Sequence, residues 1–272
     1  MTGADYFSVV EINAYESATN QPDRNLAQQE HLQIKQLLKL IGVEVIEKPA
    51  PINCQDGIYT ANWALIIDHK IVLSRLPNLR QAEEKFARSY LQELDYDILD
   101  APYIFSGQGD ALVCGDYLFV GSGYRTDKRM WPFLEKIFNL QVIGLHTIPA
   151  IDKYGKPIIN KLTSWPDSYF YDLDLALSII SPELIAWCPE AFDRTSQEII
   201  RQLKIDKIEI DYSEAVQGLA CNLISTGTDI VMSNRAPKFQ TNLEAKGFKT
   251  YTPNITELSK GGGYIRCIGL TL

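Results

Sequence analysis

The feature that most constrains the fold of this chain is a structural unit that recurs along the sequence. One copy reads as two short apolar strands at residues 59–67 and 71–75, a helix at 80–94 and a third strand at 96–99. Residues 68–70, Asp-His-Lys, are typical of a tight turn between the first two strands. The pattern predicts an α/β protein built from ββαβ units.

Further copies of this unit follow at residues 110–145, 175–210 and 221–251. A fifth copy is split between the two ends of the chain. At the N-terminus we predict a strand near residues 6–12, a helix near 25–40 that ends at Gly42, and a strand at 43–46. The apolar segment 264–272 is expected to form a strand that pairs with this N-terminal unit.

Five such units limit how the chain can assemble. A single unit cannot bury its apolar strands, whereas units arranged in a ring leave no free sheet edge. We therefore expect one domain over residues 1–272, closed by its N- and C-terminal strands. The alternative is an ordinary doubly wound α/β sheet. The irregular stretch at 149–167 interrupts the repeat, and one interpretation of it is a lid over the functional site.

Composition narrows the class of partner. Of the 272 residues, 46% are apolar, which is enough for a sizeable core. The net charge of −8 argues against nucleic acid or an anionic membrane as a partner and allows a cationic substrate. No apolar run approaches the roughly 18 residues of a membrane span, and the N-terminus does not resemble a signal peptide. We expect a cytoplasmic protein.

The five cysteines predict neither a disulfide framework nor a metal site, because they are scattered and form no Cys-x-x-Cys pair. Cys114, Cys188 and Cys221 are expected to be buried apolar residues. Cys267 differs from them, because it follows three glycines at 261–263. Glycine lets the backbone approach a bound group closely, so Cys267 is a candidate nucleophile.

Several short segments resemble one protein family. The segments are Asp56-x-x-Tyr59-Thr60-Ala61-Asn62, Gly107-Gln108-Gly109-Asp110-Ala111-Leu112, Gly123-Tyr124-Arg125-Thr126-Asp127, Phe170-Tyr171-Asp172-Leu173-Asp174, Ala220-Cys221-Asn222 and Glu257-Leu258-x-Lys260-Gly261-Gly262-Gly263-x-x-Arg266-Cys267. In order and spacing they resemble bacterial dimethylarginine dimethylaminohydrolase-like proteins of the guanidino-group-modifying (pentein, amidinotransferase-like) superfamily. The resemblance implies the pentein fold, a five-bladed α/β-propeller, in agreement with the repeat count.

The resemblance also implies a reaction. In that family a cysteine thiolate attacks the central carbon of a guanidinium group, carboxylates hold the guanidinium, and a histidine protonates the leaving amine and then activates water. The implied activity is hydrolysis of a C–N bond in a linear amidine, with no cofactor. The implied partner is a small guanidino compound such as arginine or methylarginine. A homodimer is kept open as an alternative to a monomer.

Position by position, Cys267 matches the nucleophile of the family. The acidic motif positions, which would bind substrate, are occupied by Asp56, Asp110 and Asp174. Among these, Asp174 resembles the acid that binds the guanidinium. Arg125 matches an arginine that can hold a substrate carboxylate, and Arg75 and Arg80 lie where another substrate-facing arginine is expected.

Two departures from the family pattern fall on the chemistry. Asp172 stands at the position of the histidine, and Ser106 at the position of its glutamate companion. Three hypotheses stay open. Asp172 replaces the histidine in a working hydrolase, with a pKa raised by burial and by nearby acids. Alternatively, the chain is a catalytically degenerate binding protein for guanidino compounds, or a divergent enzyme in which His146 serves as a substitute base.

Overall fold

The predicted hairpin units appear in the structure as small sheets. The computed structural model describes residues 1–272, apart from the side chain of residue 78. It contains four three-stranded sheets, in each of which an antiparallel pair is followed by a parallel third strand. The strands are β1 (Ala64–Ile67), β2 (Lys70–Leu73) and β3 (Asp97–Asp100); β4 (Ala111–Cys114), β5 (Tyr117–Val120) and β6 (Gln141–Gly144); β7 (Leu177–Ser181), β8 (Leu184–Trp187) and β9 (Asp206–Glu209); and β10 (Ile224–Ser225), β11 (Asp229–Val231) and β12 (Lys249–Tyr251).

Helices join the second and third strands of each sheet, because parallel neighbours need a crossover connection. The crossover helices are α2 (Glu84–Leu91), α4 (Met130–Phe138), α5 (Arg194–Gln202) and α7 (Pro237–Ala245). The remaining helices are α1 (Arg24–Leu40), α3 (Gly107–Asp110) and α6 (Tyr212–Gly218), with the 3-10 turns η1 (Thr60–Trp63), η2 (Asn78–Glu83), η3 (Leu173–Leu175), η4 (Pro189–Ala191) and η5 (Leu258–Gly261). The predicted mixed α/β class is confirmed. Among the described residues, no helix combines the length and apolar character needed to cross a membrane.

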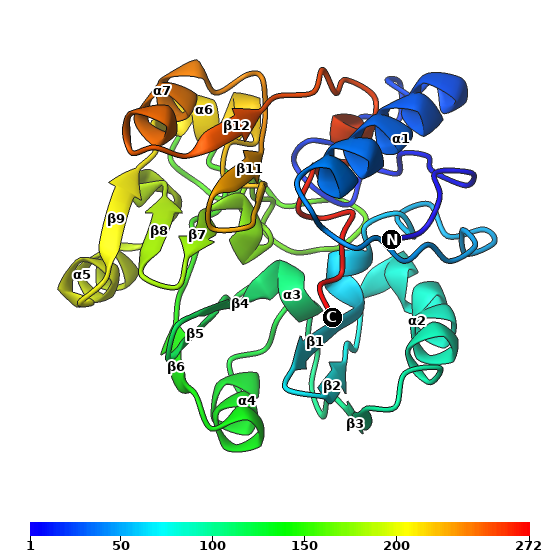
Figure 1. Ribbon diagram of the computed structural model, residues 1–272, viewed down its shortest axis with the longest axis horizontal. Coiled ribbons are helices and arrows are strands. Elements are labelled where there is room, and N and C mark those ends of the chain that lie inside the picture. Colours follow the sequence, from blue (N-terminus) through cyan, green and yellow to red (C-terminus); the bar gives the residue numbers. More distant parts are fainter.

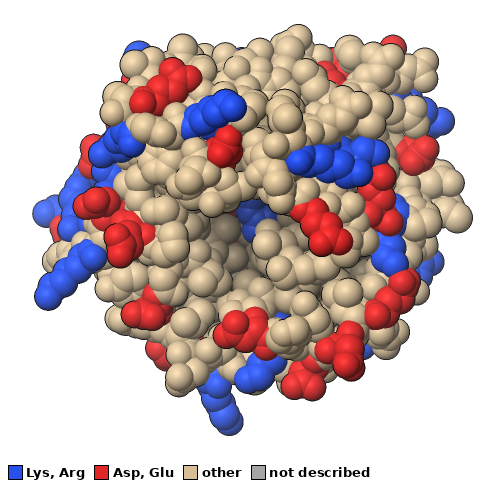
Figure 2. Space-filling view, in the orientation of Figure 1, with Lys and Arg blue, Asp and Glu red and all other residues tan. Residues whose placement is uncertain are grey.

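The four sheets follow one another around a central space (Figure 1). Their first strands, β1, β4, β7 and β10, line a cavity of about 610 Å³. The N-terminal segment with α1 lies between the sheet of β10–β12 and the sheet of β1–β3. Figure 2 shows the same face hollowed at its centre, with a basic side chain in the hollow. This arrangement brings loops from separate units toward one region.

The strands predicted near the two chain ends do not form. Those segments are residues 6–12, 43–46 and 264–272. An isolated bridge between Thr2 and Lys48 is present instead. A side-chain amide takes the place of a neighbouring strand, since Gln21 accepts the Val9 N–H at 3.0 Å and donates to the Val9 carbonyl at 2.8 Å. The prediction that terminal strands close the fold is therefore wrong.

The C-terminal segment packs instead against η1, which replaces the predicted first part of the strand at 59–67. The Ala61 N–H donates to the Cys267 carbonyl at 3.0 Å. The Thr60 hydroxyl donates to the Ile268 carbonyl at 3.0 Å. These two contacts hold the segment that carries Cys267 beside the start of β1.

The irregular stretch at 149–167 folds back on itself through two isolated bridges. Asn160 Nδ2 donates to the Glu11 carbonyl at 3.0 Å, which ties the stretch to the N-terminal loop. Its interpretation as a lid remains a prediction.

Candidate active site

The Cys267 thiol lies in a buried polar setting. Its Sγ donates to Asp174 Oδ2 at 3.4 Å and accepts from Asn222 Nδ2 at 3.1 Å. Asn222 Oδ1 in turn accepts the backbone N–H groups of Tyr264, Arg266 and Cys267, at 3.0–3.1 Å. One amide side chain therefore fixes the turn that carries the thiol and also contacts the sulfur.

The three glycines before this turn make room for neighbouring side chains. A Cβ on Gly263 would lie 2.5 Å from the ring of Tyr59, and a Cβ on Gly262 would lie 2.7 Å from Asn13 Oδ1. Gly262 also has a φ of +81°, which glycine adopts readily. The glycine run thus lets Tyr59 and the N-terminal loop pack directly against the segment that leads to Cys267.

Three aspartates lie in one cluster, and one of them, Asp174, contacts the thiol. Asp110 ends α3, while Asp172 and Asp174 flank the start of η3, and all three are buried. Asp110 Oδ1 accepts the Leu173 N–H at 2.9 Å and so anchors η3. Burial and then the charge of Asp172 raise the pKa of Asp110 well above its usual range, and the same two causes raise the pKa of Asp174 to about 7.

Two carboxylate oxygens in this group have no hydrogen-bond partner. They are Asp172 Oδ1 and Asp174 Oδ1, both buried. A buried acceptor without a partner is unfavourable, so these atoms suit a ligand that brings N–H donors. Among the described residues, no three His, Cys, Asp or Glu side chains are grouped so that they could hold a metal ion.

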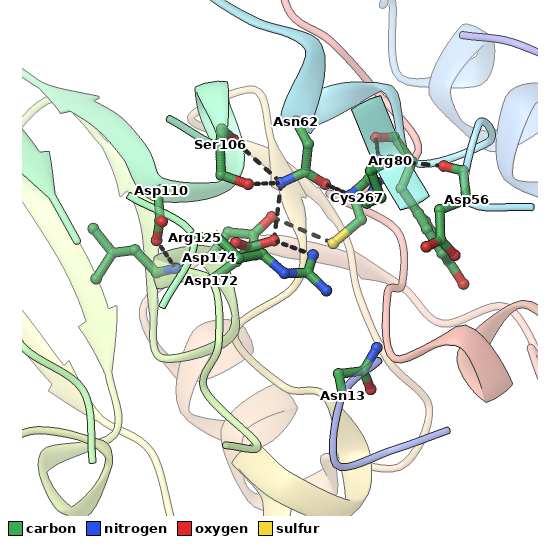
Figure 3. Close-up of polar contacts among 12 residues, drawn as sticks. Asn13, Asp56, Asn62, Arg80, Ser106, Asp110, Arg125, Asp172, Asp174 and Cys267 are labelled. Atoms are coloured by element: carbon green, nitrogen blue, oxygen red, sulfur yellow. Dashed lines mark hydrogen bonds and ion pairs between the residues drawn. The ribbon is translucent and has the colours of Figure 1, made fainter. Parts of the chain in front are cut away.

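The other oxygen of Asp172 is held by the protein. Asn62 Nδ2 donates to Asp172 Oδ2 at 2.9 Å and to Ser106 Oγ at 2.8 Å (Figure 3). Arg125 Nη1 donates to the same Asp172 oxygen at 3.3 Å. The Arg125 guanidinium also lies 4.1 Å from the ring centroid of Tyr171. Ser106 and Asp172, the two departures from the family pattern, therefore share one hydrogen-bond donor.

Arg80 makes more hydrogen bonds within the protein than Arg125 does. Its Nε and Nη2 donate to the two oxygens of Glu83, both at 2.8 Å. Its Nη1 donates to Asn62 Oδ1 at 2.6 Å, and its Nη2 to the Tyr59 carbonyl at 3.1 Å. Arg80 thus orients Asn62, which in turn contacts Asp172.

Comparison with known proteins identifies the family. No family model matches the chain. The N(G),N(G)-dimethylarginine dimethylaminohydrolase of Mycobacterium tuberculosis is 30% identical over 278 residues, which cover 100% of this chain and 84% of the relative. The chain belongs to the dimethylarginine dimethylaminohydrolase family.

A second protein similar to this chain is the bifunctional arginine dihydrolase/ornithine cyclodeaminase ArgZ of Synechocystis. It is 28% identical over 245 residues, covering 87% of this chain and 32% of the relative. The crystal structure of the N-terminal domain of ArgZ, covalently bound to a reaction intermediate, matches with a TM-score of 0.87 at 25% identity, covering 99% of this chain and 95% of that domain. The chain thus spans about a third of ArgZ.

Two residues that the dimethylarginine dimethylaminohydrolase resemblance or the alternatives singled out lie apart from the group. Arg75 is exposed and donates to the Pro102 carbonyl at 3.1 Å. His146 is exposed, and its Nδ1 lies 2.9 Å from Ser122 Oγ. The structure therefore connects Arg80 to Asp172 through Asn62 and leaves Arg75 and His146 outside.

A second set of unpartnered carboxylate oxygens lies toward the N-terminal loop. Asp56 Oδ1 and Glu16 Oε1 are both buried without a hydrogen bond. Burial raises the pKa of Asp56 to about 6 against the charge of Arg80. Burial, and next the charge of Asp56, raise the pKa of Glu16 to about 9. In Figure 3, Asp110 and Asp56 lie on opposite sides of Arg125.

Motif matching within the dimethylarginine dimethylaminohydrolase family singles out some of these residues and misses others. Asn62 and Asn222 stand inside segments that carry the resemblance, so their position was the available signal. Glu83, three residues after Arg80, is a pairing that helix spacing could have found. Nothing in the sequence pattern singles out Glu16.

The thiol itself is in an unfavourable setting for ionisation. Burial raises the pKa of Cys267 well above its usual range, and the Asp174 charge raises it further. The contacts to its sulfur come from a carboxylate and an amide. Ionisation of Cys267 therefore depends on a nearby positive charge or a proton acceptor.

Proposed function

We propose that this chain binds a guanidino compound of the arginine or methylarginine type at Asp172 and Asp174. The observation that carries the proposal is the pair of buried, unpartnered oxygens, Asp172 Oδ1 and Asp174 Oδ1. The other oxygen of Asp174 accepts the hydrogen bond of the Cys267 thiol. A guanidinium is a planar fork of N–H donors that suits paired carboxylate oxygens. Its positive charge would also stabilise a thiolate at Cys267.

In this proposal the bound group is modified covalently by Cys267. The sulfur attacks the guanidinium carbon, an amine leaves, and water then releases a ureido product and the free thiol. The proton handling falls to carboxyl groups, because Asp172 stands where the family has its histidine. The activity is hydrolysis of a C–N bond in a linear amidine.

The remaining residues would bind the far end of the substrate. Arg125 makes one contact to Asp172, so its other N–H groups are free to hold a carboxylate. We assign Asp56 and the neighbouring Glu16 to an ammonium group, since both present unpartnered buried oxygens. Asp110 would act indirectly, through its bond to the Leu173 N–H in η3.

The second candidate is a binding protein without turnover. It is favoured by the high pKa of the Cys267 thiol and by the contacts of Asp172 to Asn62 and Arg125, which occupy one oxygen of the residue at the histidine position. A missing general acid or base lowers rates by roughly 10²–10⁴. Such a protein would bind the same compounds and release them unchanged.

The architecture in this proposal is a single five-bladed propeller over residues 1–272. The N-terminal segment with α1 takes the place of a fifth blade between the first and last sheets (Figure 1). It lacks a sheet of its own, so this blade would be completed by loops.

A product assay together with calorimetry tests the function. Wild type and Cys267→Ala are incubated with arginine, methylated arginines and agmatine, and ureido product and free amine are measured. Turnover by wild type alone supports the hydrolase. If wild type and Cys267→Ala both bind a compound and neither turns it over, the result supports the binding protein. If neither protein binds any of the compounds, both candidate functions are contradicted. Asp172→His with Ser106→Glu is expected to raise turnover if the two departures limit it.

A further inference from the structure

We infer that Asp174 is a catalytic residue that accepts the proton of the Cys267 thiol and passes it to the leaving nitrogen. This inference rests on the proposed guanidino chemistry of the site. It assigns to Asp174 the protonation of the leaving amine, which the histidine carries out in the family. Asp172 then has no role in this proton transfer.

The geometry separates the two aspartates. Asp174 Oδ2 receives the thiol hydrogen at 3.4 Å, and both side chains are almost completely buried, at 1% and 2% exposure. Asp172 makes no such contact and is bonded to the cationic Arg125 and to Asn62. Asp174 is bonded to the group whose proton has to move.

The charges around Asp174 support a role in proton transfer. Burial and next the charge of Asp172 favour its protonated form, while Arg266 favours its ionised form. Cys267 and the buried Cys221 are the thiols beside it. With a pKa of about 7, Asp174 is divided between its two forms near neutral pH, which is the condition for both accepting and returning a proton.

The S–H bond of Cys267 breaks, an O–H bond forms on Asp174 Oδ2, and the sulfur lone pair forms a bond to the guanidinium carbon. The carbon–nitrogen bond of the leaving group then breaks, and that nitrogen takes the proton from Asp174. The products are a cationic S-linked intermediate on Cys267, a neutral amine and an ionised Asp174, which is ready to activate water.

Alkylation of Cys267 by neutral iodoacetamide tests the inference without requiring turnover. In wild type, we expect the rate of Cys267 alkylation, followed by peptide mass analysis, to rise with pH through about 7. Asp174→Asn should remove this rise and slow alkylation at pH 8 at least about tenfold. Asp174→Glu, which keeps a carboxyl group, should restore part of the rate.

The matched control is Asp172→Asn, which removes the same charge from the same cluster. We expect it to keep the rise but at a lower pH than in wild type, because the charge of Asp172 helps to raise the pKa of Asp174. It should also react faster, because loss of a neighbouring negative charge lowers the thiol pKa. If Asp174 acts only through its charge, Asp174→Asn would also react faster than wild type, and the inference would be overturned. A wild-type Cys267 that is never alkylated would overturn it too.

Two further measurements keep the outcome clear. If Asp174→Asn does not fold, the wild-type profile decides, because a rise confined to pH values above about 9 reports the thiol alone and contradicts the inference. Calorimetry with arginine on Cys267→Ala reports guanidino binding separately. Failure of the proton-transfer inference is therefore distinguishable from failure of the proposed function.

Discussion

Two buried arginine–carboxylate pairs in this protein use the same chemistry and are completed differently. Arg80 and Glu83 form a bidentate pair at 2.8 Å, and further N–H groups of Arg80 reach Asn62 and backbone carbonyls. Arg125 and Asp172 meet through one contact at 3.3 Å, and Asp172 Oδ1 has no partner. The first pair is satisfied within the fold, whereas the second leaves capacity for a ligand.

The difference shows how this structure separates scaffold from site. Glu83 also accepts from Trp63 Nε1 at 2.8 Å, so the Arg80 pair is tied into the apolar core beneath η1. The Arg125 pair stands instead between Tyr171 and the aspartates near Cys267. Burial alone does not tell the two apart, because all four charged side chains are buried. The two pairs differ in their unpartnered atoms, because Asp172 has one and Glu83 has none.

The largest effect is expected from breaking the satisfied pair. Glu83→Gln should lower the free energy of unfolding by about 3–5 kcal/mol, because it leaves the charge of Arg80 buried without its bidentate partner. Urea denaturation followed by circular dichroism measures this. A loss no greater than that caused by Asp172→Asn would contradict the distinction between the pairs.

A smaller effect, on binding more than on folding, is expected at the incomplete pair. Asp172→Asn should weaken guanidino binding about 10–100-fold, since a hydrogen bond to a charged group is worth about 1.5–3 kcal/mol. Isothermal calorimetry with arginine on the Cys267→Ala background measures the affinity. Arg75→Ala is the control, because Arg75 lies outside the group, and its affinity should match the background. Equal losses in the two variants would contradict the assignment of the site.

The smallest effect concerns pH and the N-terminal side of the site. The fold raises the pKa of Glu16 to about 9. At a pH between the ordinary pKa of glutamate and about 9, the folded state therefore holds a proton that the unfolded state has released. Stability consequently falls as the pH rises toward 9. Wild type should lose several degrees of Tm between pH 6 and pH 9, at about 2–4 °C per kcal/mol. Glu16→Gln should reduce that loss. Thermal melts of the two proteins across this range measure it, and identical slopes would argue that Glu16 is ionised in the fold.

The regular units were predictable because their signals are local. The turn at Asp68 and His69 joins β1 to β2 with positive φ at both residues, as a tight hairpin turn requires. The absence of strands at the two chain ends was not predictable, because the backbone groups of these segments bond to side chains and to η1 instead of to a neighbouring strand. Gln21 bonds to Val9 at one end. At the other end the segment with Cys267 bonds to η1.

The candidate site was predictable only in part, and for a related reason. Motif positions identified Cys267, Asp110, Asp172 and Asp174, which the structure places together. The choice between Arg75 and Arg80 could not be made from spacing. Both lie between β2 and α2, and the direction of each side chain depends on partners distant in the chain. Arg80 meets Asn62, whereas Arg75 meets the Pro102 carbonyl.

The sequence by itself determined the repeating hairpin–helix–strand units and the residues available for chemistry, because apolar periodicity, turn residues and motif positions are properties of neighbouring residues. The tertiary structure alone decided which polar atoms are satisfied. Whether Asp174 faces a thiol, whether Asp172 keeps a free oxygen and whether Arg80 is already occupied depend on groups brought together from separate units around the centre. Hydrogen bonds are made in space, so their completion, which distinguishes a binding site from a buried scaffold here, appears only when the whole chain is folded.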